Sequence, residues 1–249
     1  MAHMPQWFDY DWPLDGRDAR FRVDLALASA PQAERPVLVY VSCESKREKA
    51  DSLNALETGR AEAVCKKCLK ALAPFYAGYI ETGAQRQYYF YVKEAELLDE
   101  ADRIAEKELF LECRAGMQQE PGWATYKKLL YPDAAKLQTE DNRKRINLMT
   151  EHGDNPAAAR RIALFLFFHT ETAMLLFSEQ ARISGFAVGD PVFTPEFDRA
   201  YGVRIMRIAP LKKKEIDELT TRAIRIAEKF DGELRYWEAP MAKRGGPLM

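Results

Sequence analysis

Arg-Ile-Ala-Leu-Phe-Leu-Phe-Phe-His, at residues 161–169, contains an unbroken apolar run from Ile162 to Phe168. The run is far shorter than the roughly 20 residues of a membrane-spanning helix. Its alternate positions are apolar on both faces, which is not typical of a strand with one solvent-facing side. The pattern therefore predicts a strand that is covered on both sides or lies at the centre of a sheet. Such a strand needs neighbouring strands and a helix layer from the flanking sequence.

Composition places the chain among ordinary globular proteins. It has 249 residues, of which 47% are hydrophobic and 30% charged, and its formal net charge is −1. That length suits one large or two small domains. The near-neutral charge lacks the basic footprint of a nucleic-acid binder, so no direct nucleic-acid partner is expected.

Location is predicted from what the sequence lacks. No apolar run reaches the length of a membrane span and no signal peptide is recognised, so no membrane association is expected. The four cysteines have no secretory context, which predicts reduced thiols and a cytoplasmic location.

The first half of the chain predicts a β–α–β–β–α–β order over Val37–Met117, with one extra strand in front. Apolar periodicity, aromatic enrichment and turn residues support these elements. The expected strands and helices are Phe21–Ala28, Val37–Ser42, Arg60–Ala73, Tyr76–Thr82, Arg86–Lys93, Glu94–Lys107 and Leu109–Met117.

The second half repeats the same order of elements. The expected strands and helices are Arg161–His169, Thr170–Ile183, Gly185–Phe193, Val203–Ile208, Lys212–Phe230 and Leu234–Glu238. With right-handed crossovers, each half forms a four-stranded antiparallel sheet with two helices on one face. The predicted fold class is therefore α+β, with two ferredoxin-like units.

Domain boundaries follow from this repeat. We predict an N-terminal α+β domain at residues 5–118, a helical connector at 119–156 and a C-terminal domain at 157–241. The bare sheet faces of the two units could pack on each other, or the connector helices could lie across one of them. An apolar face left uncovered would be an interaction surface.

Cys65-Lys-Lys-Cys68 has the CxxC spacing of a redox pair or of half a zinc site. No second CxxC and no clustered histidine accompanies it, and both thiols fall on the apolar stripe of a predicted helix. Core packing is the favoured interpretation for this pair. The same interpretation applies to Cys43 and Cys113, which lie at strand positions. Neither a metal nor another cofactor is expected.

Other candidate residues also favour structural roles. His169 ends the apolar strand, where a general base could sit, but no nucleophile or metal ligand lies at a diagnostic spacing from it. Tyr88–Tyr91 is aromatic like the base-stacking strands of RNA-binding sheets, yet no basic residues are interleaved. The cluster Lys212–Lys214 opens a predicted helix and favours a solvated face, with binding of phosphate or an acidic partner as the alternative. No catalytic residue is predicted.

A family resemblance enters at the C-terminal half. Gly185-Phe-Ala-Val-Gly-Asp190 after a helix, and Ala227-Glu-Lys-Phe-Asp231 followed by Glu233 and Trp237, resemble the RraB family of ribonuclease E inhibitors. The resemblance covers roughly Asp141–Pro240. It implies a protein that regulates an RNA-degradation enzyme by binding it. The chain departs from the family pattern at Leu234-Arg-Tyr236, where members often carry Tyr-Asp-Gly.

The N-terminal half is similar to the family called domain of unknown function 695. The matching features are the Trp7 region and Pro121-Gly-Trp-Ala-Thr-Tyr126, followed by Leu129-Leu-Tyr-Pro132. This family implies no known activity.

These observations favour a non-enzymatic regulator that binds another protein, with a ribonuclease or its scaffold region as the implied partner. Aromatic and arginine residues dominate binding hot spots. The predicted contact residues are therefore Trp237, Tyr236, Arg235, Phe193 and Phe197. Two alternatives remain. One is an immunity-type protein that binds a toxin, and the other is a small enzyme or metal protein that uses Cys65/Cys68 or His169. An open sheet edge would also allow a homo-oligomer.

Overall fold

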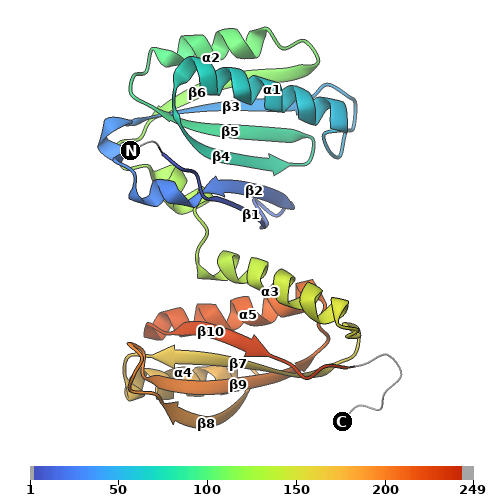
Figure 1. Cartoon of the computed structure of the whole chain (residues 1–249), viewed down its shortest axis with the longest axis vertical. Coiled ribbons are helices and arrows are strands. Elements are labelled where there is room, and N and C mark those ends of the chain that lie inside the picture. Colours follow the sequence, from blue (N-terminus) through green and yellow to red (C-terminus); the bar gives the residue numbers. More distant parts are fainter. Residues whose placement is uncertain (1–2, 243–249) are drawn as a thin grey trace. The chain divides into compact units, whose positions relative to one another are not determined.

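The structure is a computed structural model that describes residues 3–242 (Figure 1). The chain divides into two compact units between Pro132 and Asp133, here called unit 1 and unit 2. The predicted connector at 119–156 spans this division, so its two parts belong to different units. Among the described helices, none is both long and apolar enough to cross a bilayer. The mixed α/β class with antiparallel sheets is confirmed.

Unit 1 is built on one antiparallel sheet with the strand order β1-β2-β4-β5-β3-β6. Its strands are β1 (Trp7–Asp11), β2 (Ala19–Asp24), β3 (Val37–Ser45), β4 (Phe75–Thr82), β5 (Gln85–Val92) and β6 (Leu111–Gln119), and its helices and short turns are α1 (Ala55–Leu72), α2 (Leu97–Glu106), η1 (Leu25–Ser29), η2 (Gln32–Glu34) and η3 (Tyr126–Leu130). The prediction of a four-stranded sheet is wrong for this unit, because β1 and β2 extend the sheet beyond β4.

A glycine makes the extension possible. Gly78 in β4 has φ +129°, and a Cβ atom at this position would lie 1.8 Å from the backbone oxygen of Arg22 in β2. Only a residue without a side chain allows β2 to pair so closely with β4. The pairing of Val23 with Gly78 is therefore fixed by one residue that the periodicity of the sequence does not mark.

Both faces of the unit 1 sheet are covered. Helices α1 and α2 pack on one face through a core that includes Val39, Val64 and Ile104. On the other face, Trp123 and Tyr126 lie among a second buried cluster with Tyr91. The first part of the predicted connector thus closes unit 1, which is one of the two arrangements that the sequence left open.

Unit 2 has a four-stranded antiparallel sheet with the order β10-β7-β9-β8. Its elements are α3 (Ala134–Glu151), β7 (Arg160–Phe168), α4 (Glu171–Ile183), β8 (Ala187–Phe193), β9 (Tyr201–Ala209), α5 (Lys213–Ala227), η4 (Glu228–Phe230) and β10 (Glu233–Glu238). The central position predicted for the 161–169 strand is confirmed, since β7 pairs with both β9 and β10.

The helices of unit 2 gather on one side of its sheet. Helices α4 and α5 contact the strands, and α3 packs along α5 (Figure 1). Every second residue of β7, namely Ile162, Leu164, Leu166 and Phe168, is fully buried in this core. The intervening residues of β7 point to the opposite face of the sheet.

Alanine substitutions at two glycines should have opposite effects on unit 1. Gly78→Ala should lower the free energy of unfolding by at least about 3 kcal/mol, because the new methyl group meets the Arg22 carbonyl. Gly59→Ala, in an exposed and open site of α1, should raise it by about 1 kcal/mol, since glycine weakens a helix interior.

Urea unfolding, with hydrogen exchange of β2 and α1 peptides, measures both effects in unit 1. A stable Gly78→Ala variant with unchanged protection in β2 would show that β2 does not depend on the close approach.

Candidate functional site

The sheet face of unit 2 that lies opposite the helices, here called the open face, carries side chains from three strands. Paired residues of neighbouring strands share a face, so the register defines its rows. One row is Arg204, Phe165 and Tyr236, and the next is Met206, Ala163 and Glu238. None of these six side chains belongs to the core under the helices.

Five residues form an aromatic cluster at one end of the open face: Phe165, Phe167, Phe197, Arg235 and Tyr236. The rings of Phe165 and Tyr236 stack with centroids 4.4 Å apart. The guanidinium of Arg235 lies between two rings, 4.2 Å from the centroid of Phe167 and 4.1 Å from that of Phe197. Its Nε–H also donates to Glu233 Oε1 at 3.1 Å, so the two rings and this carboxylate together hold Arg235 in place.

Solvent exposure makes the cluster available for contact. Tyr236 is 41% exposed and Phe197 46% exposed, whereas Phe167 is covered by its neighbours. Gly202 pairs with Phe167, and a Cβ atom there would lie 2.7 Å from the Phe167 ring. The glycine therefore leaves the space in which the Phe167 ring lies.

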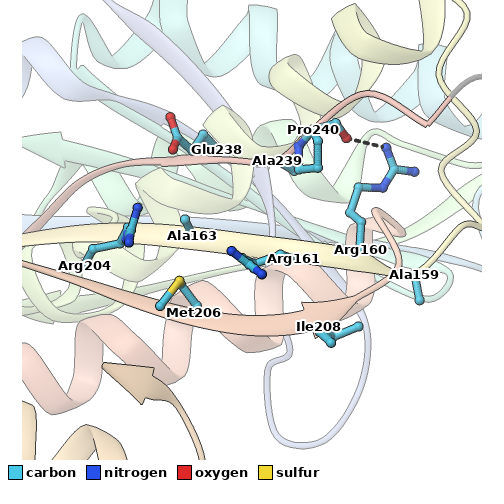
Figure 2. Close-up of a pocket in the computed structure, with 10 residues that line it drawn as sticks. All are labelled: Ala159, Arg160, Arg161, Ala163, Arg204, Met206, Ile208, Glu238, Ala239 and Pro240. Atoms are coloured by element: carbon cyan, nitrogen blue, oxygen red, sulfur yellow. Dashed lines mark hydrogen bonds between the residues drawn. The ribbon is translucent and has the colours of Figure 1, made fainter. Parts of the chain in front are cut away.

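A hollow of about 760 Å³ lies at the other end of the open face (Figure 2). Met206, Ile208 and Ala163 supply apolar surface, while Arg161, Arg204 and Glu238 supply charge. Its full lining is Ala159, Arg160, Arg161, Ala163, Arg204, Met206, Ile208, Glu238, Ala239 and Pro240. The combination is suited to a side chain or segment that carries both apolar atoms and a carboxylate.

The arginines of the hollow have different roles. Arg160 is buried and donates to the carboxylate of Asp154, to the carbonyl of Asn155 and, at 3.0 Å, to the carbonyl of Pro240. It fixes the wall of the hollow. Arg161 and Arg204 are exposed, and within residues 3–242 neither forms an ion pair, so both guanidinium groups are available.

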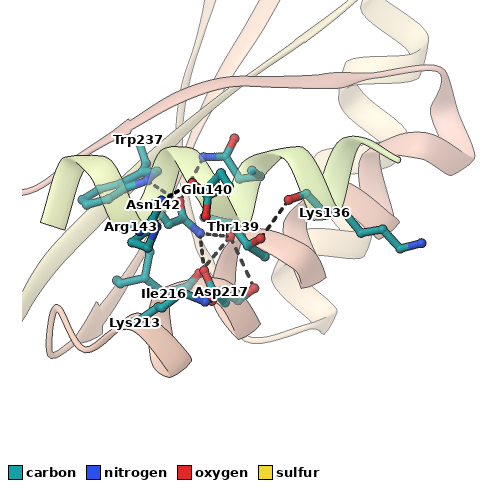
Figure 3. A network of polar contacts seen from close by, with 11 residues as sticks. Lys136, Thr139, Glu140, Asn142, Arg143, Lys213, Ile216, Asp217 and Trp237 are labelled. Atoms are coloured by element: carbon teal, nitrogen blue, oxygen red, sulfur yellow. Dashed lines mark hydrogen bonds and ion pairs between the residues drawn. The ribbon is translucent and has the colours of Figure 1, made fainter. Parts of the chain in front are cut away.

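Trp237 lies on the side of β10 opposite Tyr236. Its indole is 1% exposed, and its Nε1–H donates to Asn142 Oδ1 at 2.7 Å (Figure 3). The Asn142 amide nitrogen in turn donates to Thr220 Oγ1 at 2.9 Å and Asp217 Oδ1 at 2.8 Å. This network joins α3, α5 and β10, so Trp237 holds the strand in place and has no surface for a partner to contact.

The five predicted contact residues therefore fall into three places. Arg235, Tyr236 and Phe197 come together in the aromatic cluster. Phe193 is 59% exposed but pairs with Tyr201, which packs against the core under the helices, so Phe193 lies on the other face. Trp237 is in the core.

Sequence reasoning missed the β7 and β9 residues of the open face. Phe165 and Phe167 were assigned to a strand that is covered on both sides or lies at the centre of a sheet, and no expectation was attached to Arg204 or Met206. Two features of the sequence could have indicated this face. Arg204 and Met206 alternate with Ile205 along one strand, and the predicted helices are enough to cover only one face of the apolar strand.

The thiol alternative receives no support from the geometry of α1. Cys65 and Cys68 are buried in the core under the helices, which confirms their predicted packing role. Burial raises the pKa of the Cys65 thiol to about 11 and that of Cys68 to about 12, so both are protonated at neutral pH. Within residues 3–242, no cluster of three or more His, Cys, Asp or Glu could hold a metal ion.

The remaining candidates are structural or lack reactive partners. His169 is partly exposed, with ring nitrogens 3.8 Å from Asp198 and 3.6 Å from Asp231, and these contacts join two loops at the end of β7. All four residues of Tyr88–Tyr91 are buried, on alternating faces of β5. They present no ring on which a base could stack.

Comparison with known families now assigns the two units. Residues 5–131 match the model of a family of unknown function, DUF695. The chain belongs to the DUF695 family. Residues 139–239 match the model of a second family, RraB, described as regulator of ribonuclease activity B. The second match contains every strand of the unit 2 sheet and therefore the whole of its open face.

Other comparisons add little. No curated protein matches the chain. One structural match is the crystal structure of an unknown protein from Galdieria sulphuraria. The match covers 84% of this DUF695 chain and 100% of the Galdieria sulphuraria chain, at 12% identity and a TM-score of 0.23.

Adjacent substitutions in β10 should separate the two sides of the strand. Trp237→Phe should lower the free energy of unfolding of unit 2 by about 2 kcal/mol, because it removes the hydrogen bond to Asn142 and leaves unfilled volume. Tyr236→Phe should change it by less than about 0.5 kcal/mol, since the hydroxyl lies on the exposed side.

Urea unfolding followed by hydrogen exchange of β7 and β10 peptides would measure this difference. Equal losses in the two variants would show that the Trp237–Asn142 bond does not hold β10.

Proposed function

We propose that this chain is a non-enzymatic, cytoplasmic regulator that binds another protein through the open face of unit 2. We further propose that the partner is a ribonuclease or the scaffold region of an RNA-degradation complex. The main support is the match of residues 139–239 to the RraB family. The open face is the apolar sheet surface of this matched region that remains exposed.

The composition of the open face supports protein binding. Hot spots in protein interfaces are rich in tyrosine and arginine, and surrounding residues exclude water from them. Tyr236 and Arg235 have this character, and each is already held by a ring of β7. Little side-chain freedom is then lost on binding, which favours affinity.

Charge further defines the segment that would fit. Arg161 and Arg204 are available cations, and Glu238 is the acidic residue that lines the hollow with them. An arginine fork binds a carboxylate through two parallel hydrogen bonds. We therefore propose that the partner presents acidic side chains beside an apolar or aromatic one, with the apolar group over Met206 and Ile208.

The strand orders also bear on fold type. Strands β4-β5-β3-β6 in unit 1 and β8-β9-β7-β10 in unit 2 follow the same order relative to the chain. We propose on this basis that both units are variants of the ferredoxin-like arrangement, with two added strands in unit 1.

Binding should depend on the aromatic cluster. Calorimetric titration of the purified chain into ribonuclease E from the same organism, with the catalytic and scaffold regions tested separately, should give saturable binding. A separate cleavage assay should show that ribonuclease E cuts RNA more slowly when the chain is present. Tyr236→Ala and Arg235→Ala should each weaken binding by about tenfold or more, which is the loss of about 1.4 kcal/mol or more. Phe193→Ala is the matched control, because it removes an exposed aromatic ring from the other face.

Two results would overturn this assignment. One is the absence of binding to either region by the folded wild type. The other is a loss on Phe193→Ala that equals the loss on Tyr236→Ala, since this would place the contact away from the open face.

Charge reversal in the hollow should act on the rate of association. Arg161→Glu combined with Arg204→Glu should reduce the association rate at low salt by about tenfold and flatten its dependence on ionic strength. Arg207→Glu is the control, because Arg207 pairs with Ile162 of the helix-side row and does not line the hollow. Stopped-flow kinetics at several salt concentrations measure the effect, and an equal change in both variants would contradict a role for the hollow.

A further inference from the structure

The four cysteines of the chain, which are scattered in sequence, converge on the helix-side core of unit 1. Cys43, Cys65 and Cys68 are buried members of that core, and Cys113 packs against it. Cys43 lies in β3 and Cys113 in β6, directly opposite each other in the antiparallel register. The Cys113 thiol donates a hydrogen bond to the Cys43 sulfur, with 2.9 Å between the two sulfur atoms.

The geometry of this pair meets the requirement for a covalent link. Directly opposed residues of antiparallel strands have Cα atoms about 4.5–5.5 Å apart. Disulfides join residues whose Cα atoms are about 4.4–6.8 Å apart. The two sulfur atoms already face each other, so the bond needs a rotation of the side chains and no rearrangement of the backbone.

We propose that Cys43 and Cys113 form a redox site in unit 1, at which a low-molecular-weight disulfide oxidises the pair to an intramolecular cross-strand disulfide. The proposal concerns unit 1 and goes beyond the binding function proposed for unit 2. The sequence suggested redox activity for the Cys65/Cys68 pair of α1, whereas this proposal assigns it to the Cys43/Cys113 pair.

The order of the reaction follows from access. Cys113 is partly exposed and lies on β6, the edge strand of the sheet, whereas Cys43 is completely buried on the neighbouring strand. The Cys113 thiolate attacks the small disulfide, forms a mixed disulfide and releases one thiol. Cys43 then loses its proton and attacks the Cys113 sulfur, which releases the second thiol.

The step is balanced. Two protein thiols and one small disulfide give one protein disulfide and two small thiols, so two electrons and two protons pass to the oxidant. A dithiol reductant reverses the reaction. The hydrogen-bonded contact with Cys113 and then burial raise the pKa of the Cys43 thiol, which fits its role as the second group to react.

Oxidation has a structural consequence. The link would close the chain around α1, β4, β5 and α2, which are the elements between the two cysteines. A cross-link over a loop of this length removes entropy from the unfolded chain. The oxidised form of unit 1 should therefore resist unfolding more than the reduced form.

Oxidation of the folded full chain with glutathione disulfide, followed by alkylation under denaturing conditions and non-reducing peptide mapping, tests the site. The expected product is monomeric, has lost two of its four thiols and contains one linkage, Cys43–Cys113. Cys65→Ala/Cys68→Ala should retain this product, and Cys113→Ser should abolish it. The same oxidation in urea should give mixed pairings, because the folded register no longer selects one.

A thermal measurement gives an independent readout. Oxidation should raise the unfolding midpoint of unit 1 by about 10 °C in the wild type and in Cys65→Ala/Cys68→Ala. Oxidation should leave the unfolding midpoint of the Cys113→Ser variant unchanged. A Cys65–Cys68 linkage, a stable mixed disulfide at Cys113 or an unreacted pair in the folded wild type would each overturn the proposal.

Discussion

The unit 2 sheet depends on a constraint imposed by its central strand. Strand β7 is hydrogen-bonded to β9 and β10, and its side chains are apolar on both faces. Ile162, Leu164, Leu166 and Phe168 meet the helix layer, which buries them completely. The side chains between them, including Phe165 and Phe167, cannot reach that layer because successive residues of a strand point in opposite directions. Their apolar surface must be covered by other groups.

The chain covers this second face only in part. Tyr236 lies over Phe165, while Phe197 and Arg235 lie over Phe167. These covering groups themselves remain exposed, and the hollow beside them has an apolar floor with available guanidinium groups. The charged groups of such a surface favour contact with water, whereas burial of its apolar area against another protein would be favourable. The buried Trp237 network sets the position of Tyr236. Successive residues of a strand point in opposite directions, so with Trp237 fixed under the helices Tyr236 must lie on the open face.

Local pattern was sufficient for much of this fold. The apolar run at 161–169 identified the central strand, and helix periodicity placed Cys65 and Cys68 in the core. Non-local contacts were not accessible in the same way. The indole of Trp237 is satisfied by Asn142, which lies 95 positions away in sequence, so an aromatic residue near a strand end was assigned to the surface. The addition of β1 and β2 to the first sheet depends on close approach at Gly78, and the 119–132 segment folds back on unit 1 through Trp123.

The two units share an order of elements but differ in what they leave exposed. In unit 1, the segment after β6 places Trp123 against Tyr91, with ring centroids 3.9 Å apart, and closes the face opposite the helices. Within the described residues of unit 2, no segment does the same for Phe165, which is stacked only by the partly exposed Tyr236. A closed sheet protects reactive groups in its interior, such as the Cys43–Cys113 pair, and limits their access to one edge strand. An open sheet presents apolar and cationic groups to a partner. Within residues 3–242, the segment that follows β6 makes this difference, because it covers the second face of the unit 1 sheet. We therefore place the proposed redox pair in the closed unit and the proposed partner surface in the open one.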